Sequence, residues 1–299
     1  MPLLSPLRLR RARALALVLA AVPAWGRDGG EASIDIGAVR FVFVKTTRVL
    51  YHNEWELRPS APDTNLYTVR GDGSDLQPIT NYANASVRRP DVSFDGRRIL
   101  FSMNPRPKHG RWHVYECNAD GSALRQLTDG ACDDIEPFYL PNGRIGFLST
   151  RVGILDEYHR ELATLLHTMK PDGSDVRRIS FNLSHDIYPR VFRDGRIYAI
   201  RWEHRNFRTH RFPLFSIRPD GTEQFSYFGI RAWSRGFREF CELADGRLLL
   251  VWPDHRLKVR SPTLFFGEMG TVDVSQGMDA ARAERLPRSV HPLRNVHRP

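Results

Sequence analysis

The sequence predicts an all-β fold, a β-propeller built from four-stranded antiparallel blades, with about five blades in this chain. Two series of glycine turns predict it. Glycines of the first series, which follow alternating strands, lie 48, 52 and 48 residues apart, and those of the second, which precede apolar strands, lie 47, 52 and 51 apart. A repeat near fifty residues with two hairpins is typical of a propeller blade. The first series is Gly73, Gly121, Gly173 and Gly221, and the second is Gly96, Gly143, Gly195 and Gly246.

Each turn has Asp-Gly or Asn-Gly between two alternating segments. These pairs favour two-residue type I′ hairpins, because both central residues of such a turn need a positive φ. Two hairpins give four strands in each repeat. Residues 112–151 contain one complete copy, with turns at Asp120-Gly121 and Asn142-Gly143.

Residues 1–24 have the pattern of a signal peptide. Four arginines precede an apolar run from Ala14 to Val22, and Pro23-Ala24 suits cleavage after Ala24. This apolar run is too short to span a bilayer, and no other stretch approaches the roughly 20 apolar residues of a membrane helix. We therefore expect an exported protein, periplasmic or secreted, with no transmembrane segment after cleavage. Residues 25–37 are expected to form a linker.

The propeller is expected to span residues 38–288. Its first strand, residues 40–44, matches the strand that follows each second-series turn, so the chain starts in a blade at the second strand and its far end should supply the missing one. Residues 270–274 and 284–286 resemble strands of the repeat and nearly finish a fifth blade. Residues 289–299 are a basic tail or the start of a truncated blade. We favour a fragment of a six-bladed or larger ring over a closed ring of five.

A net charge of +10 could indicate a nucleic-acid-binding protein, but the net positive charge lies mainly at the two ends of the chain. Four positive charges lie in residues 1–24 and a net four lie in 281–299, so the remainder carries only two. A nearly balanced body argues against a phosphate-binding surface. We therefore expect no nucleic-acid partner.

Two long insertions interrupt the strand rhythm. In residues 152–163, apolar residues at helical spacing predict either a short amphipathic helix or a packed loop. Residues 201–213, RWEHRNFRTHRFP, are rich in arginine, histidine and aromatic residues and form either a binding loop or a solvated connection.

The chain has three cysteines, Cys117, Cys132 and Cys241. Cys117 and Cys132 belong to one blade and are a candidate disulfide, but buried strand positions for Cys117 and Cys241 are favoured. The sequence contains no Cys-x-x-Cys-His, so this chain has no site for a covalent c-type haem.

The repeats resemble those of TolB, the periplasmic propeller of the Tol-Pal system. Asp-Gly-Ser/Thr is followed by Leu-x-x-Leu/Ile-Thr/Ser, and then by Pro-x-x-x-x-Asp-Gly-Arg-x-Ile-x-Phe. A closer likeness is to the middle propeller domain of the hydrazine synthase alpha subunit. It is carried by CDDIEP at 132–137 with LSTR at 148–151, by RWEH at 201–204, and by YFG at 227–229 ahead of GFRE at 236–239.

The resemblance implies architecture and export rather than chemistry, because propellers host many unrelated functions. Hydrazine synthase looks to depend on c-type haems attached through Cys-x-x-Cys-His, and none is present here. The N-terminal domain of TolB is also missing from the pattern. The implied partner is another protein, or a haem-bearing domain or subunit.

Polar residues that precede the innermost strands are expected to converge near the central channel. As ligand-binding candidates we take Arg88, Arg89, Glu136, Trp202, Glu203, His204, Arg238 and Glu239. Carboxylates with a histidine also suit a divalent cation, and the metal candidates are Asp133, Asp134, His185 and Asp186. The alternative, which we favour, is that these charges pair with the arginines and tie the blades together.

No catalytic residue is predicted, because the sequence has no Gly-x-Ser-x-Gly, His-Glu-x-x-His or phosphate-binding glycine loop. The first hypothesis is an exported, non-enzymatic scaffold that binds a protein or small ligand through one face of the ring, with no cofactor. The second is the propeller portion of a haem-dependent oxidoreductase. The third is a metal-dependent hydrolase or lyase that uses the acidic and histidine cluster.

Overall fold

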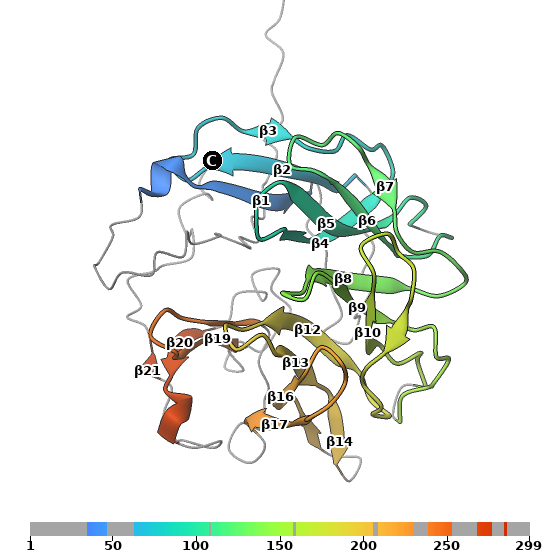
Figure 1. Ribbon diagram of the computed structural model, residues 1–299, viewed down its shortest axis with the longest axis vertical. Helices are drawn as coiled ribbons and strands as arrows, with labels where there is room; N and C mark the ends of the chain where they lie inside the picture. Colours follow the sequence, from blue (N-terminus) through green and yellow to red (C-terminus); the bar gives the residue numbers. More distant parts are fainter. Residues whose placement is uncertain are drawn as a thin grey trace, which may run out of the picture.

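The computed structural model describes residues 35–46, 63–107, 109–157, 160–205, 209–229, 239–252, 268–276 and 284–285. Five antiparallel sheets radiate from a common hub (Figure 1), and helix is limited to two short 3-10 turns, η1 (Ile36–Ala38) and η2 (Val274–Gln276), among these residues. The predicted all-β propeller is confirmed. No helix in the described ranges is long and apolar enough to cross a membrane.

The sheets follow one another along the chain, and we number them as blades 1 to 5. Blade 1 contains β1 (Arg40–Lys45), β2 (Asn65–Arg70) and β3 (Gln77–Pro78). Blade 2 contains β4 (Ser86–Val92), β5 (Arg98–Asn104), β6 (His113–Asn118) and β7 (Arg125–Gln126). Blade 3 contains β8 (Asp134–Tyr139), β9 (Ile145–Ser149), β10 (Leu165–Met169) and β11 (Arg177–Arg178).

Blade 4 contains β12 (Asp186–Val191), β13 (Ile197–Arg201), β16 (Leu214–Ile217) and β17 (Phe225–Phe228), and blade 5 contains β18 (Glu239–Glu242), β19 (Leu248–Trp252), β20 (Glu268–Val272) and β21 (Glu284–Arg285). The first strand of blades 2 to 5 lies innermost, at the hub. In blade 1, β1 occupies the second position, as expected. Blade 5 has all four strands and is complete, whereas the sequence suggested an almost finished blade.

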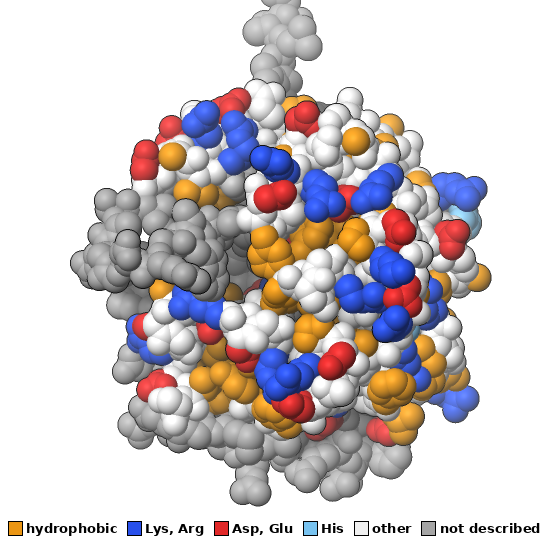
Figure 2. All heavy atoms as spheres, in the orientation of Figure 1, with side chains coloured by type: hydrophobic (Ala, Val, Ile, Leu, Met, Phe, Trp, Pro, Cys, Tyr) orange, Lys and Arg blue, Asp and Glu red, His pale blue; other side chains and the backbone are white. Residues whose placement is uncertain are grey.

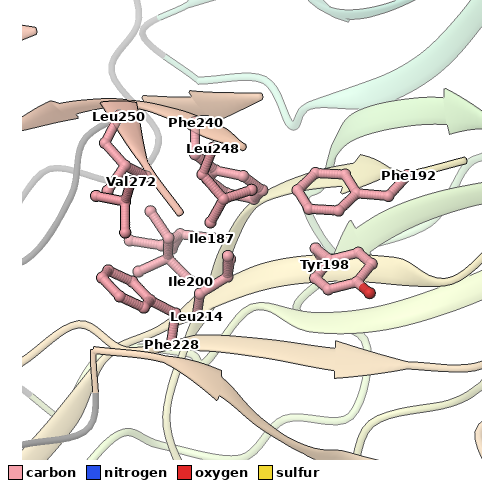
Figure 3. Close-up of a cluster of buried hydrophobic side chains, with 10 residues drawn as sticks. All are labelled: Ile187, Phe192, Tyr198, Ile200, Leu214, Phe228, Phe240, Leu248, Leu250 and Val272. Atoms are coloured by element: carbon pink, nitrogen blue, oxygen red, sulfur yellow. The ribbon is translucent and has the colours of Figure 1, made fainter. Parts of the chain in front are cut away.

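The hydrophobic core lies between neighbouring blades. Figure 3 shows the contact between blades 4 and 5, where Ile200, Leu214 and Phe228 meet Leu248 and Leu250, and each of these five side chains is fully buried. Alternate residues of each strand supply these side chains because successive residues point to opposite faces of a sheet. Consecutive blades therefore share their hydrophobic core.

The turns differ from the predicted type I′ hairpins. At Asn142-Gly143, Gly143 N donates to Leu140 O (3.0 Å) and Leu140 N donates to Arg144 O (2.9 Å), which closes a three-residue loop. Only the glycine has a positive φ, 81°. Asn142 Oδ1 accepts the N–H of Arg144 (3.1 Å), and this side-chain bond fixes a type I turn that the glycine completes as a bulge.

Strand direction divides the connections between two faces. Successive strands of each blade are antiparallel, so the tight turns of both glycine series lie at one end of the strands, which we call the turn face. The connections between second and third strands, and between blades, gather at the opposite end, the loop face. Described parts of the loop face include 109–112, 150–157, 160–164, 79–85, 127–133 and 179–185.

Both long insertions belong to the loop face. The described part of residues 152–163 forms a packed loop in which Leu155 and Leu162 make a β-bridge, so the helix alternative is not seen there. The second insertion forms a hairpin of β14 (Glu203–Arg205) and β15 (Thr209–Arg211). This hairpin extends the loop face beside blade 4 (Figure 1).

The three cysteines are free. Cys117 is buried in β6, as expected, and Cys132 is partly exposed. Cys241 is exposed, which corrects the expectation of a buried position. It follows Phe240, which is 4 % exposed and fills the core, so the alternation of β18 turns Cys241 to the other side.

Candidate functional site

The inner strands of blades 2, 3 and 4 share a β-bulge at the hub. Arg89, Glu136 and Tyr188 have φ values of 50°, 53° and 54°, and each precedes a proline. A positive φ is uncommon in a residue other than glycine, and proline suits a bulge because it cannot donate to the strand ladder. The ladder register shifts at all three places. The bulges therefore turn equivalent side chains toward the axis of the ring.

Glu136 joins three blades. Its carboxylate accepts a bond from Arg88 Nη2 (3.1 Å) and lies 3.5 Å from Arg89 Nε, both in blade 2. The backbone N–H of Tyr188 in blade 4 donates to the other oxygen (2.9 Å). Glu136 is only 4 % exposed, so its charge depends on these partners.

Glu239 occupies the equivalent position in blade 5, seven residues before its turn glycine. Arg89 Nη1 lies 2.5 Å from its Oε1, and Arg190 Nη2 of blade 4 lies 3.2 Å from its Oε2. Burial alone would raise the pKa of Glu239, but Arg89 and Arg190 outweigh burial and lower it. The guanidinium of Arg89 also lies over the Tyr188 ring, 4.4 Å from its centre.

We call Arg88, Arg89, Glu136, Tyr188, Arg190 and Glu239 the hub network. Burial lowers the pKa of Arg88, and the charge of Glu136 only partly offsets this effect. At Arg89 the charges of Glu239 and Glu136 outweigh burial and raise the pKa. Three cations and two carboxylates face one another in this network, and they connect all four blades that have an inner strand in the described part of the chain.

Asp91 lies next to this network on β4. Burial raises its pKa to about 6, against the bond that it accepts from Tyr139 N (2.8 Å) and the charge of Arg190. A carboxyl with this pKa gains or loses its proton near neutral pH.

The metal candidates of blade 3 have protein partners. Asp134 accepts bonds from Ser149 Oγ (2.5 Å) and from Arg151 Nη2, which is 3.0 Å from both carboxylate oxygens. Burial raises the pKa of Asp134, but His113, Ser149 and Arg151 together lower it. Asp133 accepts the N–H of Trp112 (3.1 Å), which fixes the start of the blade.

The metal candidates of blade 4 form a separate group. Thr164 N donates to Nδ1 of His185 (3.1 Å), so the ring proton resides on Nε2, which lies 3.0 Å from Asp156 Oδ2. Asp186 Oδ1 pairs with Arg201 Nε (3.0 Å), while its Oδ2 is buried without a hydrogen bond in the described part of the chain. No three His, Cys, Asp or Glu side chains of the described residues are grouped as a metal site. The metal site stays a prediction.

The structure brings together Arg88, Arg89, Glu136 and Glu239 of the predicted ligand site. These residues lie within the inner strands, whereas the sequence placed them just before those strands. Trp202 is buried on the loop face in a stack between His185 (5.6 Å) and Phe212 (5.7 Å), and Glu203 lies on β14. Arg238 and the side chain of His204 lie outside the described residues.

Sequence reasoning missed Tyr188, Arg190 and Asp91. A signal for the first of them was present. Arg89, Glu136, Tyr188 and Glu239 each lie seven residues before a second-series glycine, and the first three are followed by proline. Aligning the repeats on that glycine would have selected the hub positions whatever residue type occupied them.

The loop face carries exposed apolar side chains where blades 3 and 4 meet. Leu155, Phe181 and Leu183, which we call the loop-face patch, are 44 %, 68 % and 58 % exposed. The His185–Asp156 contact joins the two loops that carry them. Arg178 lies 4.6 Å from the centre of the Phe181 ring. On the face drawn in Figure 2, basic and acidic side chains are interspersed and hydrophobic ones gather near the centre.

No protein-family model matches the chain. An uncharacterized protein of Agrobacterium fabrum is 31 % identical over 91 residues, which is 30 % of each protein. Solved structures match more widely. Hydrazine synthase of Kuenenia stuttgartiensis has a TM-score of 0.63 at 18 % identity, over 78 % of this chain and 37 % of that chain.

Other solved structures match with a TM-score of 0.52, and they include the following two. TolB from Acinetobacter baumannii is 11 % identical, over 78 % of this chain and 49 % of that chain, and oligogalacturonate lyase from Vibrio parahaemolyticus is 13 % identical, over 83 % and 62 %. The chain thus spans about a third of the first relatives in each comparison. At these identities the likeness shows the fold alone. The chain has the TolB-like β-propeller fold.

Proposed function

We propose that this chain is an exported, non-enzymatic β-propeller that binds a protein or ligand through its loop face. The observation that supports this most is the hub network, in which Arg88, Arg89 and Arg190 pair with Glu136 and Glu239 of other blades. Ion pairs between blades restrict the movement of the blades relative to one another. A rigid ring is a suitable base for recognition by loops.

The loop-face patch supports the choice of face. Phe181 and Leu183 project from a short connection between two blades, and the buried His185–Asp156 pair holds that connection against the neighbouring loop. Exposed apolar groups on a rigid base lose little freedom when a partner covers them. The patch therefore suits a protein partner with an apolar contact surface.

A double variant, Phe181→Ser with Leu183→Ser, tests this proposal. Phe94→Ser is the matched control, because Phe94 is 62 % exposed on the turn face. Each purified protein would be used to capture proteins from an envelope extract, with quantification by mass spectrometry and a thermal melt of each bait. We expect one or more proteins to be retained by the wild type and the control and lost by the double variant. Equal capture by all three baits, or a loss only with Phe94→Ser, would contradict the loop-face proposal.

Export has its own test. The arginines before residues 14–22 and the small residues at 23–24 support cleavage after Ala24. We expect the mature protein to begin at Trp25 when it is recovered from the periplasm or medium, as read by N-terminal sequencing. Recovery from the cytoplasm with Met1 intact would contradict export.

A second candidate is the propeller portion of a haem-dependent oxidoreductase. The likeness to hydrazine synthase over 78 % of this chain favours it, and the haem-bearing part would come from a partner subunit or domain. A haem protein among those captured in the experiment above, identified by its Soret absorbance, would favour this candidate. A partner without haem would favour the plain scaffold.

The third candidate, a metal-dependent hydrolase or lyase using Asp133, Asp134, His185 and Asp186, requires a bound divalent cation. Its test is elemental analysis of the purified protein. Stoichiometric metal that is lost in an Asp186→Asn variant would support it, and protein without stoichiometric metal would remove it.

A further inference from the structure

The contact between blades 4 and 5 departs from the repeat on the turn face. In blades 2 to 4, the first-series glycine lies against a backbone carbonyl of the preceding blade, where a Cβ would crowd the oxygen. Blade 5 has Val274 at this position, between Asp273 and Ser275, and residues 274–276 form η2. The valine side chain needs space that a glycine does not. The glycine contacts join Gly121 to Ile79, Gly173 to Leu127 and Gly221 to Ile179.

The outer strand of blade 4 departs from the repeat at the same contact. The apolar residue at the end of the outer strand lies six positions after the turn glycine in blades 1 to 3, but seven positions after it in blade 4. The extra residue is Tyr227. Phe228 pairs with Leu214 and Ser226 pairs with Phe215, so Tyr227 is the additional residue of a β-bulge.

An open cleft of about 620 Å³ lies where these two departures meet. It is lined by Tyr227 of blade 4 and by two turns of blade 5, residues 245–247 and 273–275. Its volume is in the range of small-molecule sites. The Tyr227 ring packs edgewise against Tyr198 and Phe192, at interplanar angles of 75° and 78°, so its orientation is fixed before a ligand arrives.

The polar groups of the cleft include both donors and acceptors. Arg247 Nε lies 2.7 Å from Asp245 Oδ2, and Asp273 Oδ1 accepts bonds from the N–H (3.0 Å) and Oγ (2.6 Å) of Ser275. The Tyr227 hydroxyl can donate and accept. Two carboxylates disfavour an anion, and the guanidinium disfavours a cation. A neutral molecule with several hydroxyl groups can bond to all of these side chains.

We propose that this cleft binds a carbohydrate. A sugar has a face of C–H groups, which suits the ring of Tyr227, and a rim of hydroxyl groups, which donate to Asp245 and Asp273. Hydrogen bonds to ionised acceptors are stronger than those between neutral groups. Arg247 donates to a ring or hydroxyl oxygen of the sugar. The site lies on the turn face, opposite the loop-face patch, so sugar binding does not depend on a protein partner there.

Saturation-transfer NMR of the full chain tests this proposal. The probes are glucose, galactose, mannose and N-acetylglucosamine, with choline as a cationic comparison. We expect transfer from the protein to the C–H protons of at least one sugar, because that face lies on Tyr227. Transfer to choline alone, or to none of the probes, would overturn the proposal.

Matched variants locate the binding site. Tyr227→Leu removes the ring and Asp273→Asn removes a carboxylate of the cleft. Phe225→Leu and Asp220→Asn make the same changes outside it, because Phe225 is an exposed residue of the same strand and Asp220 accepts the equivalent bonds from Thr222 (2.9 and 2.7 Å). We expect the two cleft variants to bind the sugar about tenfold more weakly and the two controls to bind it as the wild type does. Unchanged affinity in both cleft variants, or an equal loss in the controls, would contradict the site.

Hydrogen exchange of the wild type avoids any variant that fails to fold. The bound sugar should slow exchange of the amides at residues 245–247 and 273–275, and leave the equivalent turn of blade 4, residues 220–222, unchanged. Equal slowing in the turn of blade 4, or no slowing at the cleft, would overturn the proposal.

Discussion

The turn face and the loop face of this propeller are built on opposite principles. On the turn face one device recurs in each blade, in which an aspartate accepts the N–H of the residue two positions ahead at 2.8–3.0 Å. On the loop face, blade 2 has a short connection, blade 3 a packed loop and blade 4 a hairpin. The aspartates of the turn face are Asp72, Asp120, Asp172, Asp220 and Asp273.

The difference has a physical cause. A three-residue turn tolerates few backbone conformations, so the residues that allow them are repeated. A longer connection costs little more to close as it grows, so its length and sequence are free to change. The repeat therefore encodes the ring on the turn face and at the hub, and leaves the loop face available for recognition.

The largest effect is expected at the hub, where stability should be concentrated. Glu136→Gln removes the buried charge that faces Arg88 and Arg89, and leaves these two partly buried cations with one carboxylate fewer. Removing one partner of a buried ion pair costs about 3–5 kcal/mol. Urea unfolding should register a loss of that size.

Glu223→Gln is the matched control, because Glu223 also pairs with two arginines, Arg196 and Arg218, but on the exposed rim. Exposed pairs contribute little to stability. We expect its unfolding midpoint to match the wild type. Equal losses of unfolding free energy in both variants would mean that the hub ion pairs contribute no more to stability than the exposed ones.

Much of the ring was predictable because its turns are local. The glycines of the two series mark eight tight turns in blades 1 to 5, and the strands beside them follow by alternation. The turn type was not predictable from Asn-Gly alone, because Asn142 Oδ1 decides it by accepting the N–H of Arg144. Whether residues 152–163 form a helix or a loop was likewise not predictable, because it depends on contacts with residues that are distant in the sequence.

The hub was predictable only in part. Arg88, Arg89 and Glu136 stand out as charges beside apolar inner strands, but their partners do not follow from local sequence. Arg89 and Glu239 are 150 residues apart and meet because the ring curves. Tyr188 contributes a backbone N–H and a ring face, which no search for charged residues would find.

The interior of blade 3 and the turn face should lose stability at different acidic pH values. His167 is 2 % exposed, and burial, chiefly, lowers its pKa to about 4. The unfolded chain binds this proton near pH 6.5 and the folded chain only near 4, so stability falls as pH falls between those values. The loss at pH 4.5 is roughly 2–3 kcal/mol, from about 1.4 kcal/mol for each pKa unit.

His167→Gln should remove that part of the pH dependence, measured by urea unfolding at pH 7 and pH 4.5. The turn face also loses stability as pH falls, but in a lower pH range. Ser174 lowers the pKa of Asp172, so its contribution is present above the ordinary value of 3.8 and is lost only in stronger acid. Asp172→Asn should therefore leave the change between pH 7 and 4.5 as in the wild type. A His167→Gln variant with the same acid sensitivity as the wild type would contradict this assignment.

Alanine substitutions at two glycines of the turn face should destabilise the protein by different amounts, although both glycines have a positive φ. Gly143 and Gly173 have φ values of 81° and 88°, which cost alanine about 1–2 kcal/mol in either place. A Cβ at Gly143 meets nothing within 4 Å, whereas at Gly173 it would overlap the carbonyl oxygen of Leu127 in the neighbouring blade. We expect Gly173→Ala to cost about 1–3 kcal/mol more than Gly143→Ala in thermal or urea unfolding. Equal costs would show that the turn does not press on the next blade.

The smallest effect is expected where the loop face is lengthened. Inserting Gly-Ser after Glu157, which is exposed between the bridged Leu155 and Leu162, lengthens a loop that is already long, and closure entropy predicts a cost below about 1 kcal/mol. The same insertion after Asn142 breaks the bonds of Gly143 N to Leu140 O and of Leu140 N to Arg144 O, at about 1 kcal/mol each. Urea unfolding of the two insertion variants measures the contrast. An insertion after Glu157 that costs as much as the one after Asn142 would mean that the loop is held as tightly as the turn. It would contradict the view that the loop face tolerates changes that the turn face does not.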